Sequence, residues 1–504
     1  MVEYYLNGDD TLKRIIYILQ ILQILYCIQC LKAERSPFDV SNRSNPATSF
    51  IMATASSGRT SQSAIANSGI SFQYAQSSYT GYTGISLSIS SPTIKSGAIS
   101  SYSISPNLPA GLTLDVNSGA ISGTPSGSAT NQQYTITGTS GSDTSTASFT
   151  LKIGSSTASS VYGQGNFATS GGSAGTNGLN GPYDLFFDPN GKLYVADTTN
   201  NRVVSYTSGS SSASQVYGQL GSFASTSVNN GGISANSLSS PRGLTVDTNG
   251  NLYISDYSNN RVLFYTSGST TASRVYGQLG AYNTLTMNNG GVTADSMAGP
   301  YRPAIDSNDN LYVPNIFSHR VLVYASGSTT AMRVYGQLGS FTTNTANNGG
   351  ISADSLNAPV AVALDSSGNV YIADRQNNRV LYYTAGSTTA SRVYGQLGSF
   401  TTNIANNGGI SADSLNAPTG LALDASGNLY IADSVNNRVL FYPTGSTTAT
   451  RVYGQLGSFT TNVANNGGVT ASSLSSPFNI TLDKDNKLYV ADNGNSRIVV
   501  FYVP

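Results

Sequence analysis

The chain has 504 residues, a formal net charge of zero and 10% charged residues, with one histidine and no tryptophan. This length predicts two or three domains. The balanced charge argues against a nucleic-acid-binding protein, whose surface should carry a clustered basic excess, and one histidine is too few for a zinc or iron site ligated by several histidines.

Residues 1–35 predict a signal peptide or a membrane-anchoring leader. A basic pair at 13–14 precedes an apolar run at 15–31, which glutamines interrupt. The run is short for a membrane span but suits the core of a signal peptide. Cys27 and Cys30 are the only cysteines of the chain and leave lipid attachment open, while a buried hydrophobic helix is a further alternative. We therefore expect an exported protein, located at the cell surface, in the periplasm or in the medium.

Residues 36–69 are rich in serine, threonine, asparagine and alanine and show no hydrophobic periodicity. Such a composition buries too little apolar surface to fold by itself. We expect a disordered linker.

Residues 70–153 predict a β-sandwich. Short alternating runs at 85–89, 98–104, 134–139 and 147–153 are separated by turn signals. The stretches Leu-Pro-Ala-Gly-Leu-Thr-Leu-Asp at 108–115 and Ala-Ile-Ser-Gly-Thr-Pro at 120–125 resemble the Ig-like, cadherin-like module of bacterial surface proteins. We do not extend the calcium of cadherins to this unit, because calcium needs six to eight oxygen ligands and the unit offers only Asp115 and Asp143 as carboxylates.

A repeat fills residues 158–504. Its leading aspartates follow one another at intervals of 59 residues (247 − 188 = 59, and so on), at Asp188, Asp247, Asp306, Asp365, Asp424 and Asp483. A fixed period of this length indicates a repeat architecture. The fourth copy predicts strands at 360–364, 370–373, 379–383 and 392–394. Apolar continuity decreases from the first of these to the last, so we expect burial to fall from an inner strand to an outer one, as in a propeller blade.

The ends of the repeat predict how the ring closes. The outer-strand motif Val-Tyr-Gly-Gln first occurs at Val161, before any complete blade, while the last copy ends at 499–502 without an outer strand. The simplest solution is that residues 161–163 supply the missing strand, which closes the ring and hides both sheet edges.

The pattern Asp-x-x-Gly-Asn-Leu-Tyr-Ile-Ala-Asp-x-x-Asn-Asn-Arg-Val is similar to the NHL repeat, whose members form six-bladed propellers. The third copy departs from it, with Val-Pro-Asn at 313–315 and Ser-His at 318–319. The resemblance implies an all-β chain: a six-bladed β-propeller of four-stranded blades, closed by an N-terminal outer strand and preceded by an Ig-like β-sandwich.

Candidate site residues are those that break the repeat. The pair Asp374/Arg379 recurs in nearly every copy, so we interpret it as structural, with the task of ordering the connection between second and third strands. The divergent residues cluster at the predicted channel mouth or in loops of the same face, toward blades six, one, two and three except for one in blade four. As ligand-binding candidates we list Asp184, Arg242, Arg302, Asn479, Tyr257, Phe317, His319 and Arg375. The alternative explanation for this set is genetic drift within the repeats. For His319 the alternative is a histidine that replaces a loop asparagine without a role in binding.

The sequence predicts no catalytic residues, no metal site and no cofactor. Its single histidine has no glutamate partner in the propeller, and no serine lies in a Gly-x-Ser-x-Gly elbow. We expect an exported, non-enzymatic, monomeric binding or scaffold protein, with a protein or a small anionic ligand on the propeller face and a membrane tether through the N-terminal segment as an option. A propeller lyase or lactonase is one alternative, and an RNA-binding NHL propeller is the other.

Overall fold

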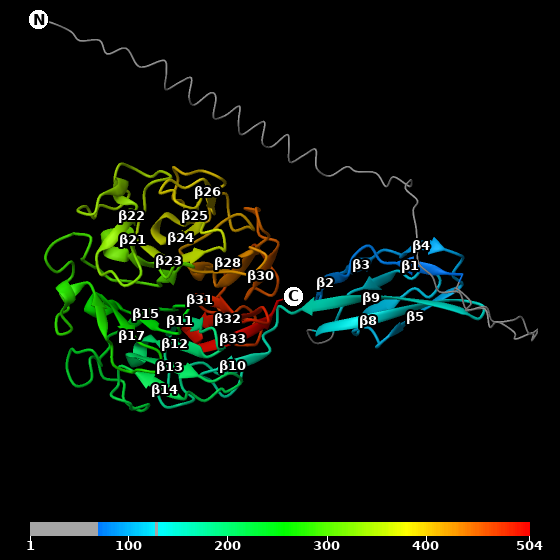
Figure 1. Cartoon of the computed structure of the whole chain (residues 1–504), viewed down its shortest axis with the longest axis horizontal. Helices are drawn as coiled ribbons and strands as arrows, with labels where there is room; N and C mark the ends of the chain where they lie inside the picture. Colours follow the sequence, from blue (N-terminus) through cyan, green and yellow to red (C-terminus); the bar gives the residue numbers. More distant parts are fainter. Residues whose placement is uncertain (1–68, 127–129, 504) are drawn as a thin grey trace, which may run out of the picture. The chain divides into compact units, whose positions relative to one another are not determined.

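This computed structural model describes residues 69–126 and 130–503, which form two successive β units (Figure 1). The expected leader at 1–35 and all but the last residue of the expected linker at 36–69 lie outside this range. Within the described residues, no helix is long and apolar enough to cross a membrane.

The first unit is a β-sandwich. One sheet has the order β2-β9-β8-β5, a second has the order β3-β7-β6, and β1 pairs with β4. Side chains alternate along β8 and β9, which places Tyr134, Ile136, Phe149 and Leu151 in the core. The strands are β1 (Ser71–Gln73), β2 (Ser78–Tyr82), β3 (Leu87–Ile89), β4 (Thr93–Ser96), β5 (Ser101–Ser105), β6 (Leu112–Leu114), β7 (Ile121–Gly123), β8 (Thr130–Ser140) and β9 (Asp143–Gly154).

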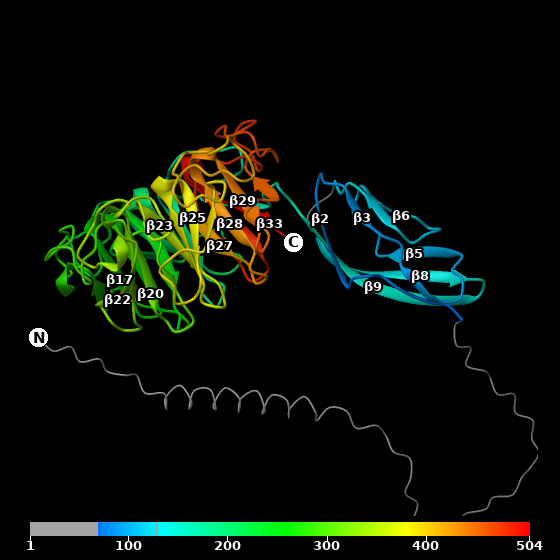
Figure 2. The same ribbon diagram turned by 90° about the horizontal axis from the view of Figure 1, so that it is seen from above.

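The second unit consists of six four-stranded antiparallel sheets arranged around one axis, with the inner strands toward the centre in Figure 1 and successive blades side by side in Figure 2. Blade one holds β11 (Pro182–Phe187), β12 (Leu193–Asp197), β13 (Arg202–Tyr206) and β14 (Gln215–Tyr217). Blade two holds β15 (Pro241–Val246), β16 (Leu252–Asp256), β17 (Arg261–Tyr265) and β18 (Arg274–Tyr276). Blade three holds β19 (Ala304–Ile305), β20 (Leu311–Asn315), β21 (Arg320–Tyr324) and β22 (Ala331–Tyr335).

The remaining blades follow the same plan. Blade four holds β23 (Pro359–Leu364), β24 (Val370–Asp374), β25 (Arg379–Tyr383) and β26 (Arg392–Tyr394). Blade five holds β27 (Pro418–Leu423), β28 (Leu429–Asp433), β29 (Arg438–Tyr442) and β30 (Arg451–Tyr453). Blade six holds β31 (Pro477–Leu482), β32 (Lys487–Asp492), β33 (Arg497–Tyr502) and β10 (Ser160–Tyr162).

Short 3-10 helices punctuate the connections. Those that join second to third strands are η1 (Thr198–Asn200), η2 (Tyr257–Asn259), η4 (Ile316–Ser318), η6 (Arg375–Asn377), η7 (Ser434–Asn436) and η8 (Asn493–Asn495). Two others, η3 (Gln278–Gly280) and η5 (Gln337–Gly339), follow the outer strands β18 and β22. We call the side of the propeller that carries the first six helices and the starts of the inner strands the η face.

The predicted closure is confirmed, because β10 pairs with β33 through Val161 opposite Val499. Aromatic contacts between neighbouring blades also support closure of the ring. Each outer-strand tyrosine meets an aromatic ring of the next blade's third strand at 5.0 to 5.4 Å between centroids, and Tyr162 with Tyr206 completes this ring of contacts at the seam. The first and last blades are therefore joined in the same way as any other two.

The predicted strands of the fourth blade agree with β23 to β26 to within one residue at each end. The predicted gradient of burial is wrong at the inner strand. All five residues of β24 are buried, whereas the last two residues of β23, Ala363 and Leu364, are only half-buried. The reason is that the inner strands line an open space on the axis, while the second strands are covered by neighbouring blades on both faces.

Blade three departs from the others because of Pro303. Proline lacks the N–H that a strand ladder needs, and β19 is reduced to Ala304–Ile305. Just before it, the N–H of Arg302 bonds to the carbonyl of Val360 in the next blade, 3.2 Å away. The chain at Arg302 has thus left its own sheet.

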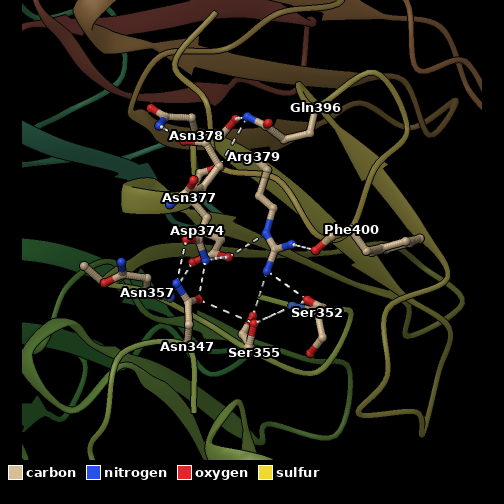
Figure 3. A network of polar contacts seen from close by, with 12 residues as sticks. Asn347, Ser352, Ser355, Asn357, Asp374, Asn377, Asn378, Arg379, Gln396 and Phe400 are labelled. Carbon is tan, nitrogen blue, oxygen red and sulfur yellow. Dashed lines mark hydrogen bonds and ion pairs between the residues drawn. The ribbon is translucent and has the colours of Figure 1, made fainter. Parts of the chain in front are cut away.

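Five of the six blades contain a buried aspartate–arginine ion pair, which we call the clasp. Figure 3 shows it for Asp374 and Arg379. The Nε of Arg379 lies 2.8 Å from Oδ2 of Asp374, and both side chains are fully buried. Oδ2 of Asp374 also accepts from Asn377, and its Oδ1 accepts from the N–H of Asn357. Burial raises the pKa of the Asp374 carboxyl, while the arginine and these donors oppose that rise; with three donors on the carboxylate, we treat it as ionised at neutral pH.

The guanidinium of Arg379 also contacts connections outside the link between second and third strands. Nη1 of Arg379 donates to the carbonyl of Phe400 in the connection that follows the blade, and Nη2 donates to those of Ser352 and Ser355 in the connection that precedes it. The prediction that the pair orders the link between second and third strands was therefore too narrow. One side chain holds two long connections, and in blade six Arg497 holds Phe167, which follows β10.

Blade three lacks the carboxylate of this clasp. Asn315 stands where the other blades have aspartate, and it still accepts from the N–H of Ala298 at 3.1 Å. Arg320 is fully buried, and its Nε has no hydrogen-bond partner among the described residues. A buried cation without a counter-charge is costly.

We predict that Asn315→Asp stabilises the protein at pH 7 by about 1–2 kcal/mol, because it restores a charge-assisted hydrogen bond to Arg320. The reverse change in blade four, Asp374→Asn, should lower the free energy of unfolding by roughly 3 kcal/mol. Denaturant unfolding of the two variants and the wild type measures both effects. A destabilised Asn315→Asp protein would show that blade three tolerates the unpaired arginine for a reason other than charge.

Candidate functional site

The eight predicted site residues divide into two groups in space. Some lie on the η face: Arg242 at the start of β15, Tyr257 in η2, Phe317 in η4, His319 just after it, and Arg375 in η6. The other three, Asp184, Arg302 and Asn479, are buried on the propeller axis at 0, 6 and 3% exposure.

Arg242 is surrounded by aromatic rings. Its guanidinium carbon lies 3.7 Å from the ring centroid of Tyr257, 4.8 Å from that of Tyr183 and 5.3 Å from that of Tyr301. Its Nη1 donates to the hydroxyl of Tyr301. Cation–π contacts of this kind hold a guanidinium in place while leaving its charge uncompensated.

The aromatic surface extends over four blades. Tyr257 lies 6.0 Å from Phe317 between centroids, Tyr183 lies 4.1 Å from Phe478, and Phe317 is 44% exposed. We call the set Tyr183, Arg242, Tyr257, Tyr301, Phe317 and Phe478 the Arg242 cluster. It lies over blades six, one, two and three.

No carboxylate pairs with Arg242 anywhere in residues 69–126 and 130–503, where the ion pairs formed by arginine all belong to other residues. Its Nε is buried without a hydrogen-bond partner in the same range. Burial raises the pKa of the neighbouring Tyr301 hydroxyl to about 12, and Arg242 opposes the rise, so this cluster stays cationic across the physiological range.

Three predicted residues meet on the axis instead. Nε of Arg302 lies 3.5 Å from Oδ1 of Asp184, and Nη1 of Arg302 donates to Oδ1 of Asn479 at 2.7 Å and to the carbonyl of Leu421. Asp184 also accepts from the N–H groups of Leu185 and Leu244. Burial raises the pKa of Asp184 to about 6, against the field of Arg302 and these donors.

The expectation that Asp184, Arg302 and Asn479 face a ligand at the mouth on the η face is therefore wrong about their accessibility. Their side chains are satisfied mainly by one another, and Arg302 ties blade three to blades one, five and six. Asp184 pairs with Arg302 and not with Arg242, which is held by aromatic rings.

His319 takes the place of an asparagine that serves a structural role. In blades one, two, four and five the residue at this position is an asparagine. Its side-chain oxygen accepts a hydrogen bond from the backbone N–H of the residue just before the inner-strand proline of the next blade, as Asn378 does from Ala417 at 2.8 Å. Nδ1 of His319 accepts from the N–H of Ala358 at 3.1 Å. The histidine thus fits the alternative reading, a loop residue replacing asparagine.

Arg375 starts η6 in blade four. It forms no ion pair in the described part of the chain, and it makes no contact with the rings around Arg242. It does not extend the Arg242 cluster.

Sequence reasoning missed Tyr183, Tyr301 and Phe478 as site residues. Each directly follows the proline at the start of an inner strand, and the equivalent residue in blades two, four and five is not aromatic. That deviation from the repeat was the signal that could have identified them.

The bond to Ala358 predicts a pH effect. Burial lowers the pKa of His319 below its ordinary value, against smaller opposing contributions from Asn357 and Asp374. The folded state therefore prefers neutral His319, and its contribution to stability is present above pH 6.5 and lost as pH falls through the folded-state pKa.

We expect His319→Asn to keep the bond and to remove this dependence. Between pH 7.5 and 5, the wild type should lose roughly 1 kcal/mol more stability than the variant, about the value of one hydrogen bond. Thermal unfolding of both proteins across this range measures the difference. Parallel pH profiles would contradict a role for the histidine as an acceptor.

Comparison with known proteins identifies the parts of the chain. The family model described as "Putative Ig domain" matches residues 53–154, and the NHL repeat model matches 238–264, 356–383, 415–441 and 474–501. No curated protein matches the chain.

Several solved structures are similar in shape at low identity. A protein of unknown function from Bacteroides thetaiotaomicron has 14% identity and a TM-score of 0.47, over 87% of this chain and 99% of that one. A streptogramin B lyase has 15% identity and a TM-score of 0.37, over 65% of this chain and 94% of that one. A catalytically inactive virginiamycin B lyase from Staphylococcus aureus with quinupristin has 14% identity and a TM-score of 0.39, over 66% and 98%. Together the strand order and the family matches show that this chain is an NHL-repeat propeller with an Ig-like domain preceding it in sequence.

Proposed function

We propose that this protein is an exported binding protein and that its propeller recognises a protein partner through the Arg242 cluster on the η face. The supporting observation is a guanidinium that is held among aromatic rings and has no carboxylate partner in the described chain. Arginine and tyrosine are enriched in interface centres, where they carry much of the binding energy.

The cluster selects for a definite ligand chemistry. A carboxylate of the partner can form charge-assisted hydrogen bonds to Arg242. Phe317 and Tyr257 offer apolar area beside Arg242. We therefore expect the acidic residue of the partner to have an aromatic or aliphatic residue next to it in sequence. Because Arg242 is already fixed by its rings, little side-chain entropy is lost on binding.

A peptide library tests the proposal without a known partner. Phage-displayed peptides are selected on the full chain, and the best acidic peptide is synthesised together with its Asp→Asn or Glu→Gln form. We expect the acidic peptide to bind at least about tenfold tighter than its amide form, the equivalent of one charge-assisted hydrogen bond. Arg242→Gln should remove that difference.

A matched control is Arg274→Gln, which removes an outer-strand arginine stacked at 4.7 Å on Phe264. It should leave peptide affinity unchanged, because it disrupts a similar stack far from the η face. Peptides that bind wild type and Arg242→Gln equally well would contradict the proposed site. An enriched set without acidic residues would contradict the proposed chemistry.

Export is proposed from the basic pair and apolar run at 13–31. We predict that the mature protein lacks most of residues 1–35. Mass analysis of N-terminal peptides from fractionated cells decides the question. A cytosolic chain that retains the peptide from Met1 would rule out the exported form, while loss of that peptide in the surface or secreted fraction would support it.

A further inference from the structure

A cavity of about 230 Å³ lies on the propeller axis, in the half remote from the η face. Residues from the inner segments of all six blades line it, toward the ends of those segments. Its outer end is formed by the last residues of β23, β27 and β31, which are Leu364, Leu423 and Leu482.

Most of the residues that line this axial cavity have apolar side chains. Phe186, Val246, Ile305 and Val362 line it together with the three leucines at its outer end. Besides Arg302, the polar side chains on the wall are those of Thr245 and Thr481. A ligand that fills the space therefore contacts apolar side chains over much of its length.

Arg302 supplies a single cationic group to the same cavity. Its side chain is 7% exposed, and three contacts fix it: Asp184 at Nε, and Asn479 and the Leu421 carbonyl at Nη1. Its Nη2 has no hydrogen-bond partner among residues 69–126 and 130–503. Because the other nitrogens are held, the free one is presented in a fixed orientation, as a binding site requires.

We propose that the axial cavity binds a small aliphatic monocarboxylate, with its carboxylate on Nη2 of Arg302 and its hydrocarbon chain against the leucine-lined wall. The site is separate from the Arg242 cluster and does not depend on it. The volume corresponds to on the order of seven non-hydrogen atoms, at about 30 Å³ for each water-sized group. One free nitrogen and apolar walls suit a monoanion with a tail and exclude a phosphate dianion, which needs several donors.

The affinity of the axial cavity for a carboxylate should depend on pH. The bound carboxylate would lie near the Arg302–Asp184 pair. Arg302 is the charged group that faces Asp184, and the other contacts of the Asp184 carboxylate are the N–H groups of Leu185 and Leu244. Since burial already raises the pKa of Asp184 to about 6, a second negative charge favours its protonated form. Affinity should therefore increase as the pH falls from 8 to 5.5.

Calorimetric titration of the full chain with acetate, butyrate and hexanoate tests this. We expect one site per chain, with affinity rising about fourfold for each methylene group until the cavity is full. Hexanol, which matches hexanoate without the charge, should bind at least tenfold more weakly, and inorganic phosphate should not compete. Equal binding of hexanoate and hexanol, or competition by phosphate, would overturn the proposal.

Two variants separate the cavity from the fold. Ala363→Leu fills the cavity from β23, where Ala363 lines it, and leaves the contacts of Arg302 in place; it should abolish hexanoate binding while the unfolding midpoint stays within a few degrees. Arg302→Gln should weaken hexanoate more than hexanol. Should that variant fail to fold, Ala363→Leu still decides the matter, because undiminished hexanoate binding by it would disprove the site.

Discussion

The buried aspartate–arginine clasp is the interaction on which the propeller depends. Removing two charges from water is expensive, and the cost is recovered only when every donor and acceptor is satisfied. In blade four Arg379 meets this condition by bonding to Asp374 and to carbonyls of both neighbouring connections. The ion pair thereby converts two long loops without regular structure into fixed parts of the η face. The asparagine pair Asn347–Asn377 and the amide of Gln396 continue the same network.

The clasp and the strand ladder both weaken in blade three, and this gives the molecule its asymmetry. Asn315 leaves Arg320 without a carboxylate, and Pro303 removes a ladder donor. Released from its sheet, the chain at Arg302 pairs with the next blade and sends its side chain across the axis. Gly420 makes room for this arrangement, since a Cβ there would approach Asn479 to 2.6 Å. The polar centre of the propeller is thus a product of the irregular blade.

Two arginines with similar positions in the repeat consequently have different chemistry. Arg302 has a carboxylate partner, so its charge is compensated and one nitrogen remains for a small acid. Arg242 has rings instead of a carboxylate, so its charge is available to a partner at the surface. Proximity to the axis distinguishes the two environments. Burying the Arg302 guanidinium without a counter-charge would be costly, whereas the Arg242 guanidinium on the η face is partly solvated.

The sequence alone determined the period, the four strands of each blade, the closing strand at Val161 and the structural nature of the Asp374/Arg379 pair, because all of these follow from patterns that recur in register. It also singled out Arg242, Tyr257 and Phe317 as residues that break those patterns. It could not assign each side chain to the surface or to the axis. In five of the six blades the ladder register shifts just after the proline, as between Pro241 and Gly243, and such a bulge changes the alternation on which a sequence argument relies. In the third blade the pairing of Pro300 with Asn315 remains, but the ladder is interrupted at Arg302 and Pro303 before β19 begins. Only the tertiary structure decided that Arg242 lies among rings on the η face and that Arg302 lies beside Asp184 on the axis, since both positions result from contacts between blades distant in sequence.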